Sequence, residues 1–501
     1  MSDNQFQKEK QAHKQIQFGA IISYVALLVN IAFSLFYYPW MVEKVGKSSY
    51  GLYNLAISLV SLFMFDFGLS TVVSRYVAKY IAEKKQNYAD EFVGTIFRIF
   101  LGIDILIFIV LAVLFFLLDR IYHGLTTEEM IVFKRLFIIV SGFIVISYPM
   151  TPLNGIISAY ERFVPLKMCE LINRVLSGLM VVLALLFDAG VESLVFAYTF
   201  AGFIVIIIKI IIVYKQTPLR VSFKNERLGV YKGMLSFSIW TFIISLASRV
   251  TAAIVPSVLA MTTNSGDVAL YSPAAAIEAY YFGIANAING LFLPMVSRLV
   301  AEDRESAILP LMAKVGRYQS AVLGFLLVGL FCIGDDFMTL WMGKDFYNSY
   351  YCLLLLCLPS FFRYSQQIGN TAVVVKGFVR EQAVLSTIST GIVIIACYLM
   401  SLRWGVIGGS AAICLGGLLT VVGSNWIYQK KVGIDIKRFY RDSYGKIIIP
   451  ILVTAVVGRI LSVLIGSRGV ISFLLKGTLI TIIYVVFLWI YALDIEEKNM
   501  Q

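Results

Sequence analysis

The chain has 501 residues, of which 59% are hydrophobic and 14% are charged, and its mean hydropathy is +0.83. A soluble core cannot bury so much apolar surface, so the composition excludes an ordinary soluble domain and indicates a membrane protein. The net charge of +12 does not indicate nucleic-acid binding, because the basic residues are scattered over short loops instead of forming a basic domain.

Apolar runs separated by charged loops predict an all-α membrane protein with about 14 transmembrane helices. The N-terminus is polar, and the first apolar run is too long for the core of a signal peptide, so we expect that run to stay in the membrane. The expected spans, in chain order, are residues 17–42, 49–72, 93–118, 136–158, 168–187, 193–214, 233–261, 269–297, 318–334, 348–374, 382–402, 406–428, 447–465 and 471–493.

The loops between these spans alternate in their content of lysine and arginine. The N-terminus, the C-terminus and every second loop together carry 27 of these residues, whereas the opposite loops carry 8. Basic loops stay on the cytoplasmic side of a membrane. The alternation therefore predicts a multi-pass protein with an even number of spans and two cytoplasmic termini.

Two short motifs recur in the same order. "GLYNLA" (51–56) and "VSRYVA" (73–78) match "ALYSPA" (269–274) and "VSRLVA" (296–301), and both offsets correspond to six spans. An even number of spans restores the orientation of the chain, so the repeat is parallel. We expect two pseudo-symmetric six-helix bundles plus two extra C-terminal helices, at residues 1–218, 219–430 and 431–501.

The segment "GKSSYGLYNLAISLVSLFMFDFGLSTVVSRYVAKY" (46–80) resembles bacterial polysaccharide biosynthesis membrane proteins, the O-antigen and capsule repeat-unit flippases. These belong to the multidrug/oligosaccharidyl-lipid/polysaccharide exporter superfamily. The resemblance implies two bundles around a central cavity, alternating access, and undecaprenyl-pyrophosphate-linked oligosaccharide as cargo. It also implies a place in the bacterial plasma (inner) membrane, among membrane lipids, beside polysaccharide polymerase and glycosyltransferases.

Three arginines lie deep inside expected spans: Arg249 and Arg363 near the middle, and Arg174 about a third of the way in. A charge at the bilayer centre costs at least about 2.5–3.5 kcal/mol, so each should face a partner or a water-filled cavity. Arginine donates several hydrogen bonds and stays protonated, which suits a pyrophosphate group. We expect Arg249 to be the main phosphate-facing residue. The alternative is an ion pair with Glu278, which lies at comparable depth on the next span.

The other charges inside spans have local explanations. Glu170 and Arg174 are four residues apart on one helix face, so they can pair with each other instead of with cargo. Arg98 lies near a span end and either contacts substrate or extends to the headgroups. Lys209, Arg459 and Lys476 also lie near span ends, and we expect them to reach the headgroups in the same way.

Two carboxylates and two aromatic residues complete the candidate site. Asp66 and Asp104 lie inside spans and could bind H⁺ or Na⁺ if transport is coupled to an ion, although a structural hydrogen bond explains them equally well. Tyr280 and Tyr281 share a span with Glu278 and could stack on sugar rings, although ordinary helix packing is the simpler role.

Signatures of catalysis and of metal binding are missing from the sequence. It contains no glycine-rich phosphate loop, no nucleophile elbow and no zinc-type spacing among its six cysteines, so we expect neither an enzyme nor a cofactor. The leading hypothesis is a flippase for lipid-linked oligosaccharide. The alternatives are a cation-coupled exporter of small amphiphilic molecules and a membrane-embedded enzyme or scaffold for glycan synthesis.

Overall fold

The computed structural model describes residue 25 and residues 28–64, 69–223, 231–289, 292–466 and 469–491. Helices dominate this part of the chain, and none of it forms a strand. The expected all-α fold class is therefore confirmed. The helices group into two compact units, residues 1–269 and 270–501.

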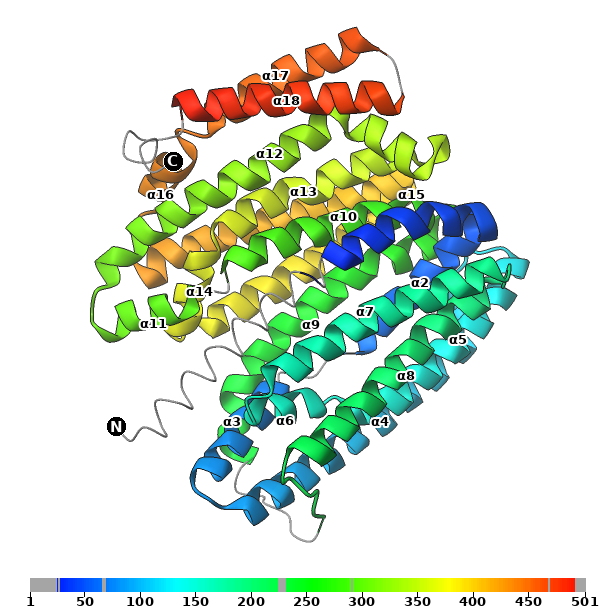
Figure 1. The fold of residues 1–501 in the computed structure, drawn as a ribbon, viewed down its shortest axis with the longest axis vertical. Coiled ribbons are helices and arrows are strands. Elements are labelled where there is room, and N and C mark those ends of the chain that lie inside the picture. Colours follow the sequence, from blue (N-terminus) through cyan, green and yellow to red (C-terminus); the bar gives the residue numbers. More distant parts are fainter. Residues whose placement is uncertain are drawn as a thin grey trace. The chain divides into compact units, whose positions relative to one another are not determined.

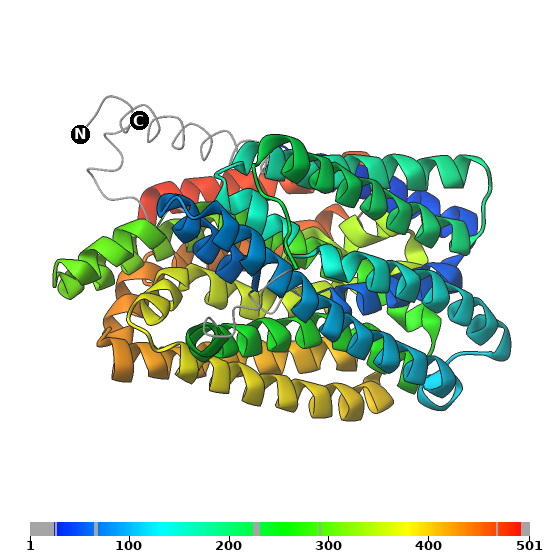
Figure 2. The ribbon, with the colours of Figure 1, turned by 90° about the horizontal axis from the view of Figure 1, so that it is seen from below.

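The first unit starts with a helix at residues 28–45, and helices follow one another with short connections (Figure 1). In chain order they are α2 (Lys47–Phe63), α3 (Leu69–Ala82), α4 (Gln86–Ile121), α5 (Thr127–Ser147), the 3₁₀ turn η1 (Tyr148–Met150), α6 (Leu153–Ala159), α7 (Phe163–Leu186), α8 (Val191–Gln216) and α9 (Tyr231–Thr262). Helix α8 packs against α5 and α7 (Figures 1 and 2), and α2 packs against α5 and α9.

The second unit contains most of α10 (Ser265–Asn289) and all later elements. These are α11 (Leu293–Ala301), η3 (Glu305–Ala307), α12 (Ile308–Met342), η4 (Lys344–Phe346), α13 (Ser349–Ser365), α14 (Gln367–Val375), α15 (Val379–Ile427), the π-helical turn η5 (Tyr428–Val432), α16 (Ile436–Tyr444), α17 (Ile448–Ile465) and α18 (Val470–Tyr491). The last two helices pack against each other and against α12 (Figure 1).

Many helices turn apolar side chains outward and polar ones inward, which is the reverse of a soluble protein. On α4, Ile105 and Phe108 are 62% and 56% exposed, whereas Asp104 is 7% exposed. Lipid covers such an apolar surface, while charged groups inside a membrane face the interior of the protein. The exposed apolar stripe therefore marks α4 as a membrane-spanning helix.

Helices coincide with all the expected spans wherever those spans are described, and nine helices in the described part are long and apolar enough to cross a membrane. One of these, α15, contains the two expected spans 382–402 and 406–428, because Gly405 has non-helical angles (φ 54, ψ −134) and reverses the chain there. Four other expected spans are each shared between two shorter helices: 49–72, 136–158, 269–297 and 348–374. The count of fourteen spans remains an expectation.

The compact units divide the chain between Ala269 and Leu270, about one span later than the boundary that we expected from the repeat. Helix α9 belongs to the first unit because it packs against α2 and α3. The division into residues 1–218, 219–430 and 431–501 rests on the sequence repeat and remains a prediction.

Candidate functional site

A cavity of about 500 Å³ opens in the first unit, and four segments of the chain form its wall. Met64 follows α2, Ser147 to Asn154 lie at the junction of α5 and α6, and α8 and α9 supply the rest. The eleven lining residues are Met64, Ser147, Met150, Thr151, Asn154, Ile206, Lys209, Ile244, Ser245, Ser248 and Arg249. Two of them are cations, five are neutral hydrogen-bonding residues, and none is acidic.

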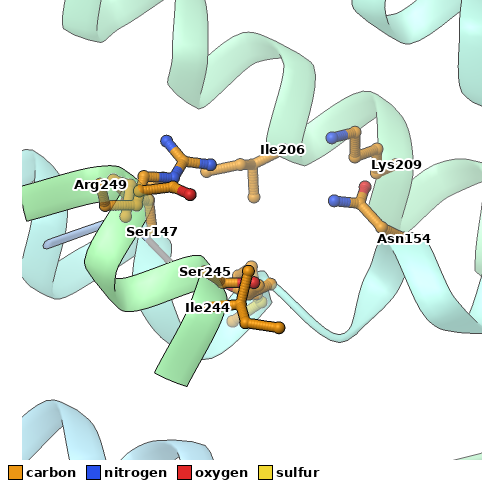
Figure 3. Close-up of a pocket in the computed structure, with 11 residues that line it drawn as sticks. Ser147, Asn154, Ile206, Lys209, Ile244, Ser245 and Arg249 are labelled. Carbon is orange, nitrogen blue, oxygen red and sulfur yellow. The ribbon is translucent and has the colours of Figure 1, made fainter. Parts of the chain in front are cut away.

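Arg249 lies on α9 at one side of this cavity (Figure 3). Its side chain is exposed, and its guanidinium donates a long hydrogen bond of 3.5 Å to the carbonyl oxygen of Ser61. Within the first unit, no described carboxylate forms an ion pair with Arg249. The cavity therefore gives this charge a polar surrounding without neutralising it.

Lys209 lies on α8 at the other side of the cavity (Figure 3). Its ammonium group and the side-chain amide of Asn154 both point into the space that separates them from Arg249. We expected Lys209 to extend to the headgroups, but its half-buried side chain lines the cavity instead. Two cations thus face one common space, and the described residues pair neither of them with a carboxylate.

Two prolines explain why α5 does not continue into α6. Pro149 and Pro152 lack the backbone N–H that a helix needs, so the chain forms the turn η1 before helix α6 begins at Leu153. This interruption brings Ser147, Thr151 and Asn154 to the cavity wall. A broken helix at membrane depth is tolerated where it borders a cavity. The segment "SYPMTPLNG" (147–155), a polar and proline-rich run inside an apolar span, is the sequence signal that could have indicated this part of the site.

The other candidate residues of the first unit lie apart from this lining. Glu170 pairs with Lys167 one turn earlier on α7, at 2.9 Å, instead of with Arg174. Arg174 is exposed. Arg98 on α4 donates to the carbonyl oxygen of Phe223 and lies 5.7 Å from the centre of its ring, so it holds the segment after α8 against α4.

Of the two carboxylates that could couple transport to an ion, the structure describes Asp104 but not Asp66. Asp66 lies outside the described residues. Asp104 is buried on α4, and its Oδ1 atom has no hydrogen-bond partner among the described residues. A buried carboxylate oxygen without a donor is ready to accept a proton or a cation.

In the second unit, four candidate residues lie on α10 and α13. Glu278 accepts hydrogen bonds from Ser360 at 2.7 Å and from Tyr364 at 3.1 Å, so its carboxylate is held by two hydroxyl groups of α13. Arg363 is exposed on the same helix. Tyr281 is buried and donates to the carbonyl oxygen of Leu323 at 3.1 Å, which is a packing role, and Tyr280 is half-buried.

The described residues do not form a candidate metal-binding site. None of their histidines, cysteines, aspartates and glutamates form a cluster that could hold a metal ion. The six cysteines are buried free thiols. The cavity of the first unit instead combines two cations with five neutral hydrogen-bonding side chains among its described lining residues.

The sequence from residue 18 to residue 300 matches the model of the family described as "Polysaccharide biosynthesis protein". The chain belongs to this family. Among curated proteins, none matches the sequence.

Solved structures share the fold at low identity. The structure described as "Lipid II flippase MurJ, inward closed conformation" is 16% identical, with a TM-score of 0.71, over 94% of this chain and 98% of that chain. An inward-facing multidrug resistance MATE family transporter of the MOP superfamily is 15% identical, with a TM-score of 0.65, over 83% and 98%. The eukaryotic MATE transporter AtDTX14 is 15% identical, with a TM-score of 0.60, over 87% and 98%. At these identities the likeness establishes a common fold.

Proposed function

We propose that this protein is a flippase that carries undecaprenyl-pyrophosphate-linked oligosaccharide repeat units from the cytoplasmic to the outer leaflet for surface polysaccharide synthesis. The observation that carries the proposal is the cavity of the first unit, where Lys209 and Arg249 face a common space and the described lining residues include no carboxylate. Membership of the polysaccharide biosynthesis family and a fold shared with a lipid II flippase support it.

The chemistry of the cavity fits a pyrophosphate headgroup linked to sugar. Arg249 offers a planar set of donors that suits two phosphate oxygens, and Lys209 offers a mobile point charge. Asn154 and the lining serines can donate to, or accept from, sugar hydroxyls. The polyprenyl tail stays in lipid, and alternating access moves the headgroup from one side of the membrane to the other. Six further residues are proposed contacts along the path of the cargo: Arg98, Arg174, Arg363, Glu170, Glu278 and Tyr280.

The remaining parts of the proposal concern energy, place and partners. Asp104 is the carboxylate that we propose for H⁺ or Na⁺ coupling, because its Oδ1 atom is buried and no described residue donates to it. The sequence adds Asp66. The protein acts in the bacterial inner membrane with both termini in the cytoplasm, beside a polysaccharide polymerase and glycosyltransferases.

Reconstituted vesicles that contain a fluorescent polyprenyl-pyrophosphate-linked oligosaccharide test the proposal. The reagent dithionite bleaches only the outer leaflet, so the extent of bleaching reports flipping. Loss of a hydrogen bond to a charged group costs about 1.5–3 kcal/mol, so Arg249→Ala and Lys209→Ala should each slow flipping by about tenfold or more. Arg249→Lys keeps the charge but loses the planar fork, and should fall between wild type and Arg249→Ala.

Matched controls separate the cavity from general charge effects. Lys215 lies six residues after Lys209 on α8, and Arg120 lies at the end of α4; both are exposed and outside the cavity. Lys215→Ala and Arg120→Ala should flip cargo within about twofold of wild type. If Arg249→Ala and Lys209→Ala flip cargo at the wild-type rate while wild type is active, the cavity is not the headgroup site.

A second function, cation-coupled export of small amphiphilic molecules, is favoured by the likeness to multidrug transporters. Among the described residues that line the cavity none is acidic, which argues against cationic cargo. Vesicles that expel cationic dyes along an ion gradient, yet move no lipid-linked sugar, would establish this second function instead of the first.

A further inference from the structure

Helix α15 folds back on itself at Gly405 and so forms two arms, residues 379–404 and 406–427. The arms run antiparallel, because Ser389 hydrogen-bonds to Gly416 and Thr420, and an added Cβ at Gly423 would lie 2.3 Å from Leu385. The free ends of both arms therefore lie at the same end of this hairpin.

A groove of about 400 Å³ lies between the arms at these free ends. Its lining residues are Arg380, Glu381, Val384, Leu385 and Ile388 from the first arm, and Gly423, Trp426 and Ile427 from the second. Ligand pockets have volumes of about 300–1,000 Å³ and combine an apolar lining with a few polar groups. This groove has that composition, and it is separate from the cavity of the first unit.

The groove reaches from the end of the hairpin into the apolar part of the spans. Arg380 is the second residue of α15, and Ile388 lies eight residues further on, which corresponds to about 12 Å of helix. The large apolar side chains along it are open: Val384, Ile388 and Trp426 are 46%, 57% and 57% exposed. An occupant must therefore have a polar end at the membrane surface and an apolar chain in the hydrocarbon.

Positive charge surrounds the polar end of the groove. Arg380 lines it, and the turn η5 after the second arm carries Lys430 and Lys431. The one acidic lining residue, Glu381, pairs with Lys431 at 3.5 Å. Among the described residues at this end, the three cations exceed the single carboxylate, so their charge attracts an anionic headgroup.

We propose that this groove binds one anionic phospholipid. Its phosphate contacts Arg380 and Lys431, and one acyl chain lies along Val384, Ile388 and Trp426. The site binds a structural lipid of the membrane, and it does not depend on the function proposed above.

Two tryptophans on the same helix allow a direct test. Trp426 lines the groove, whereas Trp404 lies at the opposite end of the hairpin, outside the groove, with a similar exposure of 55%. Two variants of the full chain each keep one of these residues and replace the other five tryptophans by phenylalanine. They are reconstituted in phosphatidylcholine vesicles that contain a small fraction of lipid with brominated chains, which quench nearby tryptophan fluorescence.

Brominated phosphatidylglycerol should quench Trp426 at about fivefold lower mole fraction than brominated phosphatidylcholine, because each basic residue near the surface favours an anionic lipid. Trp404 should show a weaker preference or none, although Arg403 lies beside it. Equal quenching of Trp426 by both lipids would overturn the proposal. An equal preference for the anionic lipid at Trp404 would do the same, because it would indicate a general effect of basic residues at the membrane surface.

A second measurement uses the chain with all six of its tryptophans. Native mass spectrometry of the purified protein should retain one phosphatidylglycerol on wild type and on the control Arg403→Gln, but about fivefold less on Arg380→Gln. Retention on Arg380→Gln at the wild-type level would contradict the headgroup assignment. Displacement of the lipid by an equal amount of undecaprenyl phosphate would overturn the proposal in favour of a site for the cargo lipid.

Discussion

Two adjacent carboxylates on α12, Asp335 and Asp336, neutralise cations from the last two helices. Lys476 of α18 lies 2.8 Å from Asp336, and their side chains are 3% and 6% exposed. Arg459 of α17 lies 3.3 Å from Asp335, and the Arg459 side chain is 35% exposed. Arg459 also donates to the carbonyl oxygen of Cys332. The two ion pairs therefore fix α17 and α18 to α12, but only the first is fully enclosed.

Removal of the enclosed carboxylate should destabilise the protein. Asp336→Asn leaves the buried ammonium of Lys476 without its carboxylate, and breaking a buried ion pair in this way costs about 3–5 kcal/mol. Asp335→Asn should cost less, because the half-exposed Arg459 can extend toward the headgroups. The unfolding temperatures of the two variants in detergent, monitored by size-exclusion chromatography after heating, measure the difference in stability.

The double variant Asp336→Leu/Lys476→Met is the matched control, because it removes both charges and keeps the apolar volume. Replacing a whole buried pair is often neutral, so the double variant should unfold near the wild-type temperature. If the double variant is as unstable as Asp336→Asn, the loss comes from packing and not from an unpaired charge.

The sequence showed that these charged residues lie inside or near spans, but it did not show where their side chains point. Depth alone assigned Lys209, Arg459 and Lys476 to the headgroups, because all three lie near the ends of expected spans. Depth does not say which face of the helix a residue occupies. Apolar residues surround Lys209 on nearly every face of α8, so no periodicity could indicate the cavity side. Asp335 and Asp336 were missed because we expected the span to end at residue 334, whereas α12 continues to Met342.

At the scale of helices, the close approach of α2 to the first residue of α10 depends on a glycine. An added Cβ at Gly51 would lie 1.9 Å from the carbonyl oxygen of Ser265, which is too close for any side chain. Gly51→Ala should therefore push the two segments apart and cost about 1–3 kcal/mol of stability. Gly102→Ala on α4 is the matched control, because nothing lies within 4 Å of an added Cβ there.

Alanine favours a helix over glycine, so Gly102→Ala should leave the unfolding temperature unchanged or raise it slightly. The comparison of the two variants removes the general effect of a Gly-to-Ala change. An unfolding temperature of Gly51→Ala equal to that of Gly102→Ala would show that the contact with Ser265 tolerates a methyl group.

Interrupted spans recur at corresponding places in the two units. In the first unit, one expected span is shared by α2 and α3 and another by α5 and α6; in the second, one is shared by α10 and α11 and another by α13 and α14. The repeated motifs "VSRYVA" and "VSRLVA" lie in α3 and α11. The repeated motifs indicated the repeat but not these breaks, and the break between α5 and α6 has its own sequence signal, the polar and proline-rich run at residues 147–155. Helix α13 contains Pro359 but continues past it and ends only at Ser365.

At the scale of the whole molecule, composition was enough to predict a membrane protein, because no soluble core could bury this apolar surface, and the length of the apolar runs was enough to predict that the fold is helical. The alternation of basic residues in the loops also predicts which ends of the helices face the cytoplasm. The structure contains no membrane and does not give this orientation. We expect Glu83 and Glu302 on the cytoplasmic side and His123 and Lys344 on the outer side. All four residues are exposed.

Cysteine labelling tests this arrangement. The six native cysteines are buried, so a cysteine introduced at an exposed position should dominate the reaction with a membrane-impermeant maleimide. In right-side-out vesicles, His123→Cys and Lys344→Cys should react at once, whereas Glu83→Cys and Glu302→Cys should react only after the membrane is permeabilised. Six expected spans separate His123 from Lys344, so a single missed or extra span between them would place the two on opposite sides. If only one of His123→Cys and Lys344→Cys is labelled from outside, the span count is wrong. If Glu83→Cys and Glu302→Cys are labelled from outside and the other two are not, the orientation is wrong.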